Sequence, residues 1–286
     1  MFSLACAQIA PKKGDLAANL DTIAEVALQA SNAGVDLVIF PEGSTTGYFL
    51  EGGVLEAALT EDELLEMVTG RLKGKLTRPL DLVLGFYQKA SGNLYNSAAY
   101  LELGRNCGRI VHVYRKFFLP TYGVFDEERF VARGKELGVF DTRLGRVAIL
   151  ICEDLWHSIL PTLSALAGAQ LLIVPSASPG RGFSGETVES LDRYHRLLTA
   201  VAEEHGIWCA NCQLCGFEGG KGFIGGSSIV DPNGVAVAIS PVIEPHLLVA
   251  DVDLDLITIA RSSSPLLADL ENAWADIQKL VNTESK

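Results

Sequence analysis

Basic residues are scarce in this sequence. Lys and Arg together number 23 against 35 Asp and Glu, which gives a formal net charge of −12 at pH 7. An acidic surface offers no attraction to nucleic acid or to an anionic membrane, so neither kind of partner is predicted. The apolar N-terminus, Met1–Ile9, has no basic segment before it, which predicts a first strand and not a secretory signal. The expected location is the cytoplasm.

The chain also lacks a convincing membrane-spanning stretch. Residues 158–180 carry no charge, but Pro161, Pro175 and Pro179 interrupt them, which favours a helix followed by a buried strand. No internal repeat, low-complexity tract or linker is visible in the sequence. Because 48% of the residues are hydrophobic, the chain can bury a sizeable core, and we predict a single domain over residues 1–286.

A second CxxC pair is absent as well. Cys209, Cys212 and Cys215 give two overlapping CxxC spacings, which raises the alternative of a zinc or redox site. Zinc would need a fourth ligand, although His205 lies nearby in the sequence. Residues 206–212 are also typical of a buried strand, in which Cys behaves as a small apolar residue. We therefore predict no metal site, and the six cysteines do not imply disulfides.

Segments typical of strands and of helices alternate along the chain, and tight turns join some neighbouring strands. This pattern predicts either a mixed-sheet α/β domain or an α-β-β-α layered domain. Thr60 and Glu63 match a capping box at the start of one helix. Strands are expected at 2–9, 35–41, 81–87, 95–103, 110–115, 146–151, 206–212, 227–230, 235–239 and 247–252, and helices at 15–33, 60–72, 162–169, 187–205 and about 264–282.

Three of these hydrophobic runs end abruptly on a reactive side chain. The residues that follow the runs at 35–41, 110–115 and 146–151 are Glu42, Lys116 and Cys152. Runs rich in apolar, β-branched residues are typical of buried strands. Open α/β sheets place their chemistry beyond the carboxyl ends of such strands. A base, a cation and a thiol are therefore predicted to meet in one pocket.

These three residue types suit nucleophilic catalysis at a carbonyl carbon. The thiolate of Cys152 would attack, and Glu42 would take the thiol proton and later pass it to a leaving amine. Lys116 would stabilise the oxyanion, with a backbone N–H near the thiol as a second donor. Spacing alone leaves plainer alternatives open, namely a structural thiol, a solvated lysine and a Pro-Glu turn.

The residues around these positions resemble the motif blocks of the nitrilase superfamily of carbon–nitrogen hydrolases. The resemblance extends from residue 2 to about residue 260 and includes Asn211-Cys-Gln213 as well as the blocks around the three reactive residues. The blocks are Phe40-Pro-Glu42 with Thr46-Gly-Tyr48, Tyr114-Arg-Lys116 with Leu119-Pro120, Ile151-Cys-Glu-Asp154, and Phe223-Ile-Gly-Gly-Ser227.

This resemblance implies an α-β-β-α sandwich, which pairs into four layers, with Glu42, Lys116 and Cys152 as the catalytic triad. It further implies a covalent thioester intermediate, no metal and no organic cofactor. Glu127 matches the additional glutamate that many members place beside the triad, with Glu128 as the alternative. A homodimer or a higher homo-oligomer is expected, to which the C-terminal helix could contribute, although that helix could equally pack on its own domain.

Within the superfamily, the chain is most similar to the glutaminase domain of glutamine-dependent NAD synthetase. Residues 115–130, 152–156 and 176–179 carry this similarity. The positions that match glutamine-binding residues of that domain are Tyr122, Glu153, Ser178 and Arg181. An arginine can hold a substrate carboxylate with two parallel hydrogen bonds. Arg181 could also be a solvent-facing residue of a Gly-Arg-Gly loop.

The resemblance implies an amidase that cleaves a small linear amide, such as glutamine or another ω-amide, to acid and ammonia. The chain ends at Lys286 without a Gly-rich phosphate loop, so NAD synthesis by this chain alone is not expected. The alternatives are a nitrilase or carbamoyl-amide hydrolase with the same triad, a glutaminase subunit that feeds ammonia to a synthetase in trans, and a non-catalytic subunit that retains the fold. The physiological substrate is left open.

Overall fold

Two six-stranded mixed sheets form the centre of the fold in the computed structural model, which describes residues 1–184 and 187–284. The strands of the first sheet are, in spatial order, β16 (His246–Val252), β1 (Phe2–Gln8), β2 (Leu37–Ile39), β3 (Leu80–Ala90), β4 (Asn93–Leu103) and β5 (Gly108–Arg115). Those of the second are β15 (Ala236–Ile239), β14 (Ser228–Val230), β11 (Trp208–Gln213), β8 (Leu171–Ser176), β7 (Gly145–Ile149) and β6 (Val139–Thr142). Each sheet contains three adjacent parallel strands. They are β1, β2 and β3 in the first sheet, and β11, β8 and β7 in the second.

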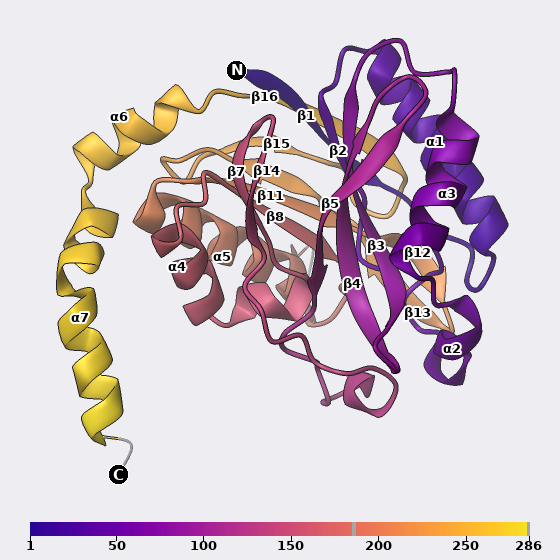
Figure 1. Cartoon of the computed structure of the whole chain (residues 1–286). Helices are drawn as coiled ribbons and strands as arrows, with labels where there is room; N and C mark the ends of the chain where they lie inside the picture. Colours follow the sequence, from indigo (N-terminus) through magenta and orange to yellow (C-terminus); the bar gives the residue numbers. More distant parts are fainter. Residues whose placement is uncertain (185–186, 285–286) are drawn as a thin grey trace.

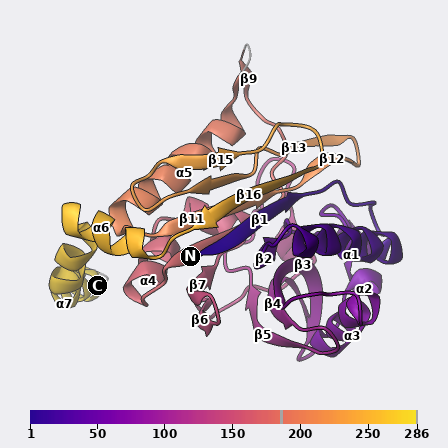
Figure 2. The same cartoon turned by 90° about the horizontal axis from the view of Figure 1, so that it is seen from above.

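Helices cover the outer faces of the two sheets, which gives the predicted α-β-β-α layers (Figure 1, Figure 2). The covering helices are α1 (Leu16–Asn32) and α3 (Glu61–Leu72) on the first sheet, and α4 (Ile159–Leu166) and α5 (Glu189–His205) on the second. The remaining helices are α2 (Val54–Ala57), α6 (Asp255–Ser263) and α7 (Leu266–Glu284). Helix α7 contacts α4 and α5 and lies at the edge of the molecule.

Shorter elements connect the layers. Two small hairpins are β9 (Phe183–Ser184) with β10 (Thr187–Val188), and β12 (Cys215–Glu218) with β13 (Lys221–Ile224). Three 3₁₀ turns are η1 (Glu51–Gly53), η2 (Glu127–Arg129) and η3 (Cys152–Trp156). The last two carry residues that the sequence places in the candidate site.

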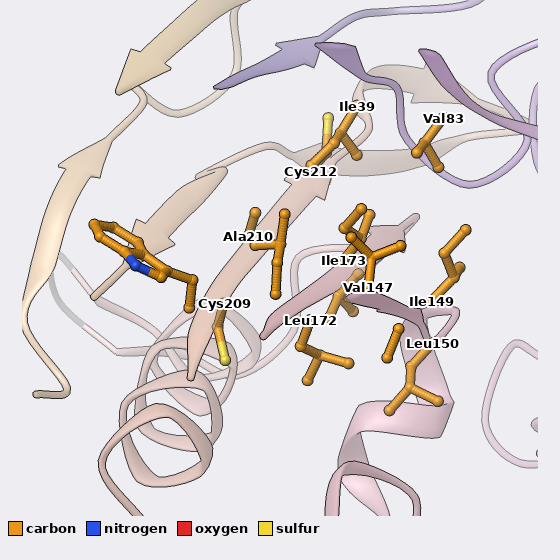
Figure 3. Packing of buried hydrophobic residues seen from close by; sticks show 14 of the residues in the cluster. Ile39, Val83, Val147, Ile149, Leu150, Leu172, Ile173, Cys209, Ala210 and Cys212 are labelled. Atoms are coloured by element: carbon orange, nitrogen blue, oxygen red, sulfur yellow. The ribbon is translucent and has the colours of Figure 1, made fainter. Parts of the chain in front are cut away.

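Successive residues of one strand belong to two different hydrophobic cores, one on each face of the sheet. In β2, Leu37 and Ile39 belong to the core between the sheets, whereas Val38 belongs to the cluster beneath α1 and α3. Successive strand side chains point to opposite faces, so a continuous apolar run buries both faces of the sheet. Figure 3 shows Ile39 and Val83 of the first sheet facing Ile173 of the second, all three fully buried.

Several predicted elements are confirmed at their boundaries. The Thr60 hydroxyl accepts a hydrogen bond from the N–H of Glu63 at 3.2 Å, and the Glu63 carboxylate accepts one from the N–H of Thr60 at 2.8 Å. This capping box starts α3. The uncharged stretch at 158–180 folds as α4 followed by β8. Within residues 1–184 and 187–284, every helix is too short or too polar to span a bilayer.

Other predicted boundaries are wrong. Helix α4 begins at Ile159 and not at 162, because Pro161 falls in the first turn, where helical N–H groups lack partners anyway. Helix α5 begins at Glu189, since the two residues before it pair with β9. Neither α6 nor the β12–β13 hairpin was predicted. That hairpin turns at Gly219 and Gly220, both with positive φ, as tight hairpin turns require.

The CxxC segment lies within the core. Cys209, Cys212 and Cys215 are free and buried. Among the residues that the structure describes, no three His, Cys, Asp or Glu side chains come together in a way that could hold a metal ion.

Candidate active site

The strand ends bring Glu42 and Lys116 into direct contact. The Lys116 ammonium donates a hydrogen bond to Oε1 of Glu42 over 2.7 Å, and both side chains are fully buried. Cys152 follows β7 and is 8% exposed. The charges of Glu42 and Lys116 both act on its thiol. The three residues that sequence reasoning grouped therefore lie in one buried site.

Three donors fix the Glu42 carboxylate. Besides Lys116, the Asn96 side chain donates to Oε1 at 2.7 Å, and the Ala177 N–H donates to Oε2 at 2.9 Å. The close packing beneath Glu42 needs a glycine, because a Cβ at Gly85 would lie 2.8 Å from the Glu42 Cα. The carboxylate thus sits in a fixed orientation, as a general base must.

A second carboxylate contacts the lysine. Oε1 of Glu127 accepts a hydrogen bond from the Lys116 ammonium at 2.8 Å and another from the Tyr48 hydroxyl. Burial alone would lower the pKa of Lys116, but the carboxylates of Glu127 and Glu42 outweigh it and raise that pKa well above its usual value. Lys116 is therefore a permanent cation. Glu128, the alternative to Glu127, is exposed to solvent.

Cys152 begins the 3₁₀ turn η3 with a φ of 51°, a conformation that non-glycine residues rarely adopt. Such outliers concentrate at functional sites. Burial raises the pKa of the Cys152 thiol, and the Glu42 carboxylate raises it further, whereas Lys116 opposes the shift. The resting thiol is consequently neutral, and a reaction at sulfur has to begin with transfer of its proton to a base.

Asp154 ties the lysine segment to the turn that carries the thiol. Its carboxyl oxygens accept hydrogen bonds from the N–H groups of Phe117, Phe118 and Ile151 at 3.1, 2.7 and 3.0 Å. The Tyr114 hydroxyl donates to the same carboxyl group at 2.9 Å. Burial raises the pKa of Asp154 to about 6, although these hydrogen bonds oppose the shift. Asp154 thus holds two reactive segments in register.

The structure also brings three of the four predicted substrate-binding residues together. The Tyr122 hydroxyl donates to the Glu153 carboxylate at 2.7 Å, and the Arg181 guanidinium lies 5.9 Å from the centre of the Tyr122 ring. A cavity of about 310 Å³ opens here, lined by Tyr122, Trp156, Arg181, Glu189, Ser190 and Arg193. It offers two cations and a carboxylate to a small polar ligand.

Ser178, the fourth of these residues, does not line that cavity but lies at the end of the second sheet. It follows Ala177, whose N–H binds the Glu42 carboxylate, and it is 6% exposed. Within the described part of the chain, its hydroxyl oxygen has no hydrogen-bond partner. Buried hydroxyl groups are normally paired, so this one is available to a ligand.

Sequence reasoning missed several residues that complete the site. Asn96 on β4 binds Glu42, Tyr48 binds Glu127, and Tyr194 on α5 touches the Cys152 thiol at 3.1 Å. Tyr48 belongs to a quoted motif block, whereas Asn96 lies in a stretch that also holds Asn93, Ser97 and Glu102, so its polarity carries no signal. Nothing in the sequence distinguishes Tyr194 from an ordinary buried tyrosine.

The titration of Glu127 predicts how stability depends on pH. Burial raises the pKa of this carboxyl group to about 7 against an ordinary value of 4.5, although Lys116 opposes the shift. The folded state therefore binds the proton more tightly than the unfolded state. The resulting stabilisation is complete below pH 4.5 and is lost as the pH rises through 7. Its size is on the order of 2–3 kcal/mol.

Urea unfolding of Glu127→Gln and wild type between pH 4.5 and 8 measures this contribution. The unfolding free energy of the variant, relative to wild type, should increase by on the order of 2–3 kcal/mol across that range. Glu128→Gln, at an exposed neighbouring position, serves as the control and should follow the wild-type curve. Parallel curves for Glu127→Gln and wild type would show that Glu127 titrates normally.

Comparison with known proteins identifies a family and several related structures. The family model described as carbon–nitrogen hydrolase matches residues 3–262. Glutamine-dependent NAD(+) synthetase from Thermotoga maritima is 31% identical over 87% of this chain and 42% of its own length. An amidase from Nesterenkonia sp. is 28% identical, with a TM-score of 0.74 over 96% of both chains, and one of its mutants was solved with butyramide.

A carbon–nitrogen hydrolase from Helicobacter pylori G27 is 23% identical over 94% of both chains, with a TM-score of 0.83, and it shares the fold. The chain spans about half the length or less of the curated relatives it matches most strongly, between 42% and 50%.

Proposed function

The chain belongs to the carbon–nitrogen hydrolase family, and we propose that it hydrolyses a small linear amide to an acid and ammonia. Glutamine and other ω-amides are the leading substrate class. The observation that carries this proposal is the buried Lys116 ammonium between the carboxylates of Glu42 and Glu127, next to the Cys152 thiol. As a carbon–nitrogen hydrolase, the enzyme acts on non-peptide carbon–nitrogen bonds.

The proposed reaction begins with transfer of the thiol proton from Cys152 to Glu42. The sulfur attacks the amide carbon, and the carbonyl oxygen becomes an oxyanion that Lys116 and a backbone N–H stabilise. Collapse of this intermediate breaks the C–N bond, and Glu42 returns the proton to the nitrogen, which leaves as ammonia. Water then attacks the thioester while Glu42 accepts its proton, the C–S bond breaks to release the acid, and Glu42 returns the proton to the departing thiolate, which restores the resting thiol.

The lining of the 310 Å³ cavity supports an amide that carries a carboxylate. Arg181 can bind a carboxylate with two parallel hydrogen bonds. Glu153 accepts a hydrogen bond from Tyr122, which lines the cavity, and its carboxylate can accept another from an ammonium group. An α-amino acid amide such as glutamine offers both groups. Ser178, with its unpartnered hydroxyl, can serve the same ligand.

Ammonia release from glutamine, asparagine, butyramide and butyronitrile tests the proposal. We expect the enzyme to hydrolyse glutamine with the highest kcat/KM. Arg181→Gln should raise the KM for glutamine by about 10- to 100-fold, since a hydrogen bond to a charged group is worth about 1.5–3 kcal/mol, and should leave butyramide nearly unaffected. Arg196→Gln, on the exposed face of α5, is the control.

The panel also distinguishes the alternatives. Preferential turnover of butyronitrile would identify a nitrilase. Release of no ammonia from any amide by the wild-type protein would contradict the proposal. An equal effect of Arg181→Gln on glutamine and butyramide would refute the assigned role of the guanidinium group.

A further inference from the structure

Tyr194 provides the side-chain hydroxyl that contacts the candidate nucleophile. Its oxygen lies 3.1 Å from Sγ of Cys152, within hydrogen-bonding range for sulfur. The tyrosine is 1% exposed and stands on α5, so the contact is shielded from water. Its ring also packs edge-on against Trp156, with the ring centres 5.8 Å apart. Packing and helix together hold the hydroxyl in place.

The charges around the sulfur explain why such a donor matters. Glu42 disfavours a negative sulfur, whereas Lys116 favours it. The Lys116 ammonium, however, already donates to two carboxylates at 2.7 and 2.8 Å. The phenols of Tyr48 and Tyr122 also interact with the thiol but are neutral at ordinary pH, whereas the backbone N–H of Ala177 favours a negative sulfur. Once Glu42 holds the thiol proton it is neutral, and because the Lys116 ammonium is shared among several acceptors, a neutral hydrogen-bond donor next to the sulfur would stabilise its negative charge.

Tyr194 can act only as such a donor once the sulfur is negative. Burial raises the pKa of Tyr194 well above its ordinary value, and a charged Cys152 would raise it further. The phenol thus keeps its proton throughout the working pH range. The thiol proton moves to Glu42, as in the proposed reaction, and Tyr194 neither gains nor loses one.

We propose that Tyr194 is a catalytic residue, whose hydroxyl donates a hydrogen bond to the Cys152 sulfur when Glu42 has removed the thiol proton. This role rests on the proposed function, in which Cys152 is the nucleophile. The same donor stabilises the sulfur again when the thioester breaks and the thiolate departs. Tyr194 follows Arg193 directly on α5, so the helix that lines the substrate cavity also carries the donor.

The pH dependence of Cys152 alkylation by iodoacetamide tests the proposal without requiring amide turnover. The Cys152 peptide is followed by mass spectrometry, because Cys107 is exposed and also reacts. Tyr194→Phe should raise the apparent pKa of alkylation by about one unit and lower the rate at pH 7.5 by about tenfold. Tyr100→Phe removes another buried hydroxyl, bound to Asp81 at 2.7 Å, and should match wild type.

A purely structural role for Tyr194 predicts a profile that superimposes on that of wild type, and this result would overturn the proposal. If Tyr194→Phe does not fold, 3-fluorotyrosine at position 194 replaces it, since its more acidic hydroxyl is a stronger donor. The apparent pKa of alkylation should then fall, and an unchanged value would overturn the proposal. If the pH profile of Cys152 alkylation shifts as expected but the wild-type protein cleaves no amide, Tyr194 still donates to the Cys152 sulfur. In that case the proposed function is refuted and the hydrogen bond from Tyr194 is not.

Discussion

Cys152→Ala is expected to lower the rate of amide hydrolysis by about 10⁵-fold, because removing a covalent nucleophile leaves only binding and oxyanion stabilisation. Ammonia release over long incubations measures the residual rate. The substitution removes only the sulfur atom and leaves every residue that lines the substrate cavity unchanged. Calorimetric titration should accordingly give a Kd for glutamine within about threefold of the wild-type KM, because a difference of that size is less than 1 kcal/mol.

Cys209→Ala is the matched control for this experiment. Cys209 is a fully buried free thiol on β11, and its replacement should change the rate less than about threefold. Wild-type protein quenched during turnover should also carry an acyl adduct at Cys152 by mass spectrometry, and the alanine variant should carry none. Hydrolysis by Cys152→Ala within tenfold of wild type would rule out the thioester mechanism.

The layered fold could be predicted because its buried strands appear in the sequence as continuous apolar runs. A run such as Leu37–Ile39, apolar on both faces, is stable only when both faces are covered, here by a helix layer and by the second sheet. The capping box at Thr60 likewise fixed the start of α3 through local hydrogen bonds. Elements that are specified by residues close together in the sequence, such as these strands and the start of this helix, were therefore predicted correctly.

The sequence predicted less where tertiary contacts decide the structure. The contact between Tyr194 and Cys152 joins residues 42 positions apart, and no local pattern encodes it. The same holds for Asn96, which reaches Glu42 over 54 positions. The three reactive residues were found because each follows an apolar strand. Their partners sit within a strand or a helix, where a polar residue carries no positional signal.

Lys116→Met is expected to destabilise the fold as well as to abolish activity. The substitution leaves the buried carboxylates of Glu42 and Glu127 without their cation. Removing one partner from a buried ion pair costs about 3–5 kcal/mol. Chemical unfolding at pH 7.5 measures the loss. Lys89→Met breaks a surface ion pair with Glu63 at 3.3 Å, both side chains partly exposed, and should lower the unfolding free energy far less.

The pH dependence of the Lys116→Met variant distinguishes lost charge pairing from lost packing. Without the cation, the pKa of Glu127 should rise further, so the folded state gains affinity for protons and the stability loss should shrink as the pH falls from 8 to 5. Lys116→Met combined with Glu127→Gln removes one of the two uncompensated charges and should recover on the order of 1–2 kcal/mol at pH 8. Hydrolysis should stay abolished, because the oxyanion still lacks its cation. A stability loss that is equal at both pH values, and that the second substitution does not reduce, would mean that Lys116 stabilises the site by packing and not by its charge.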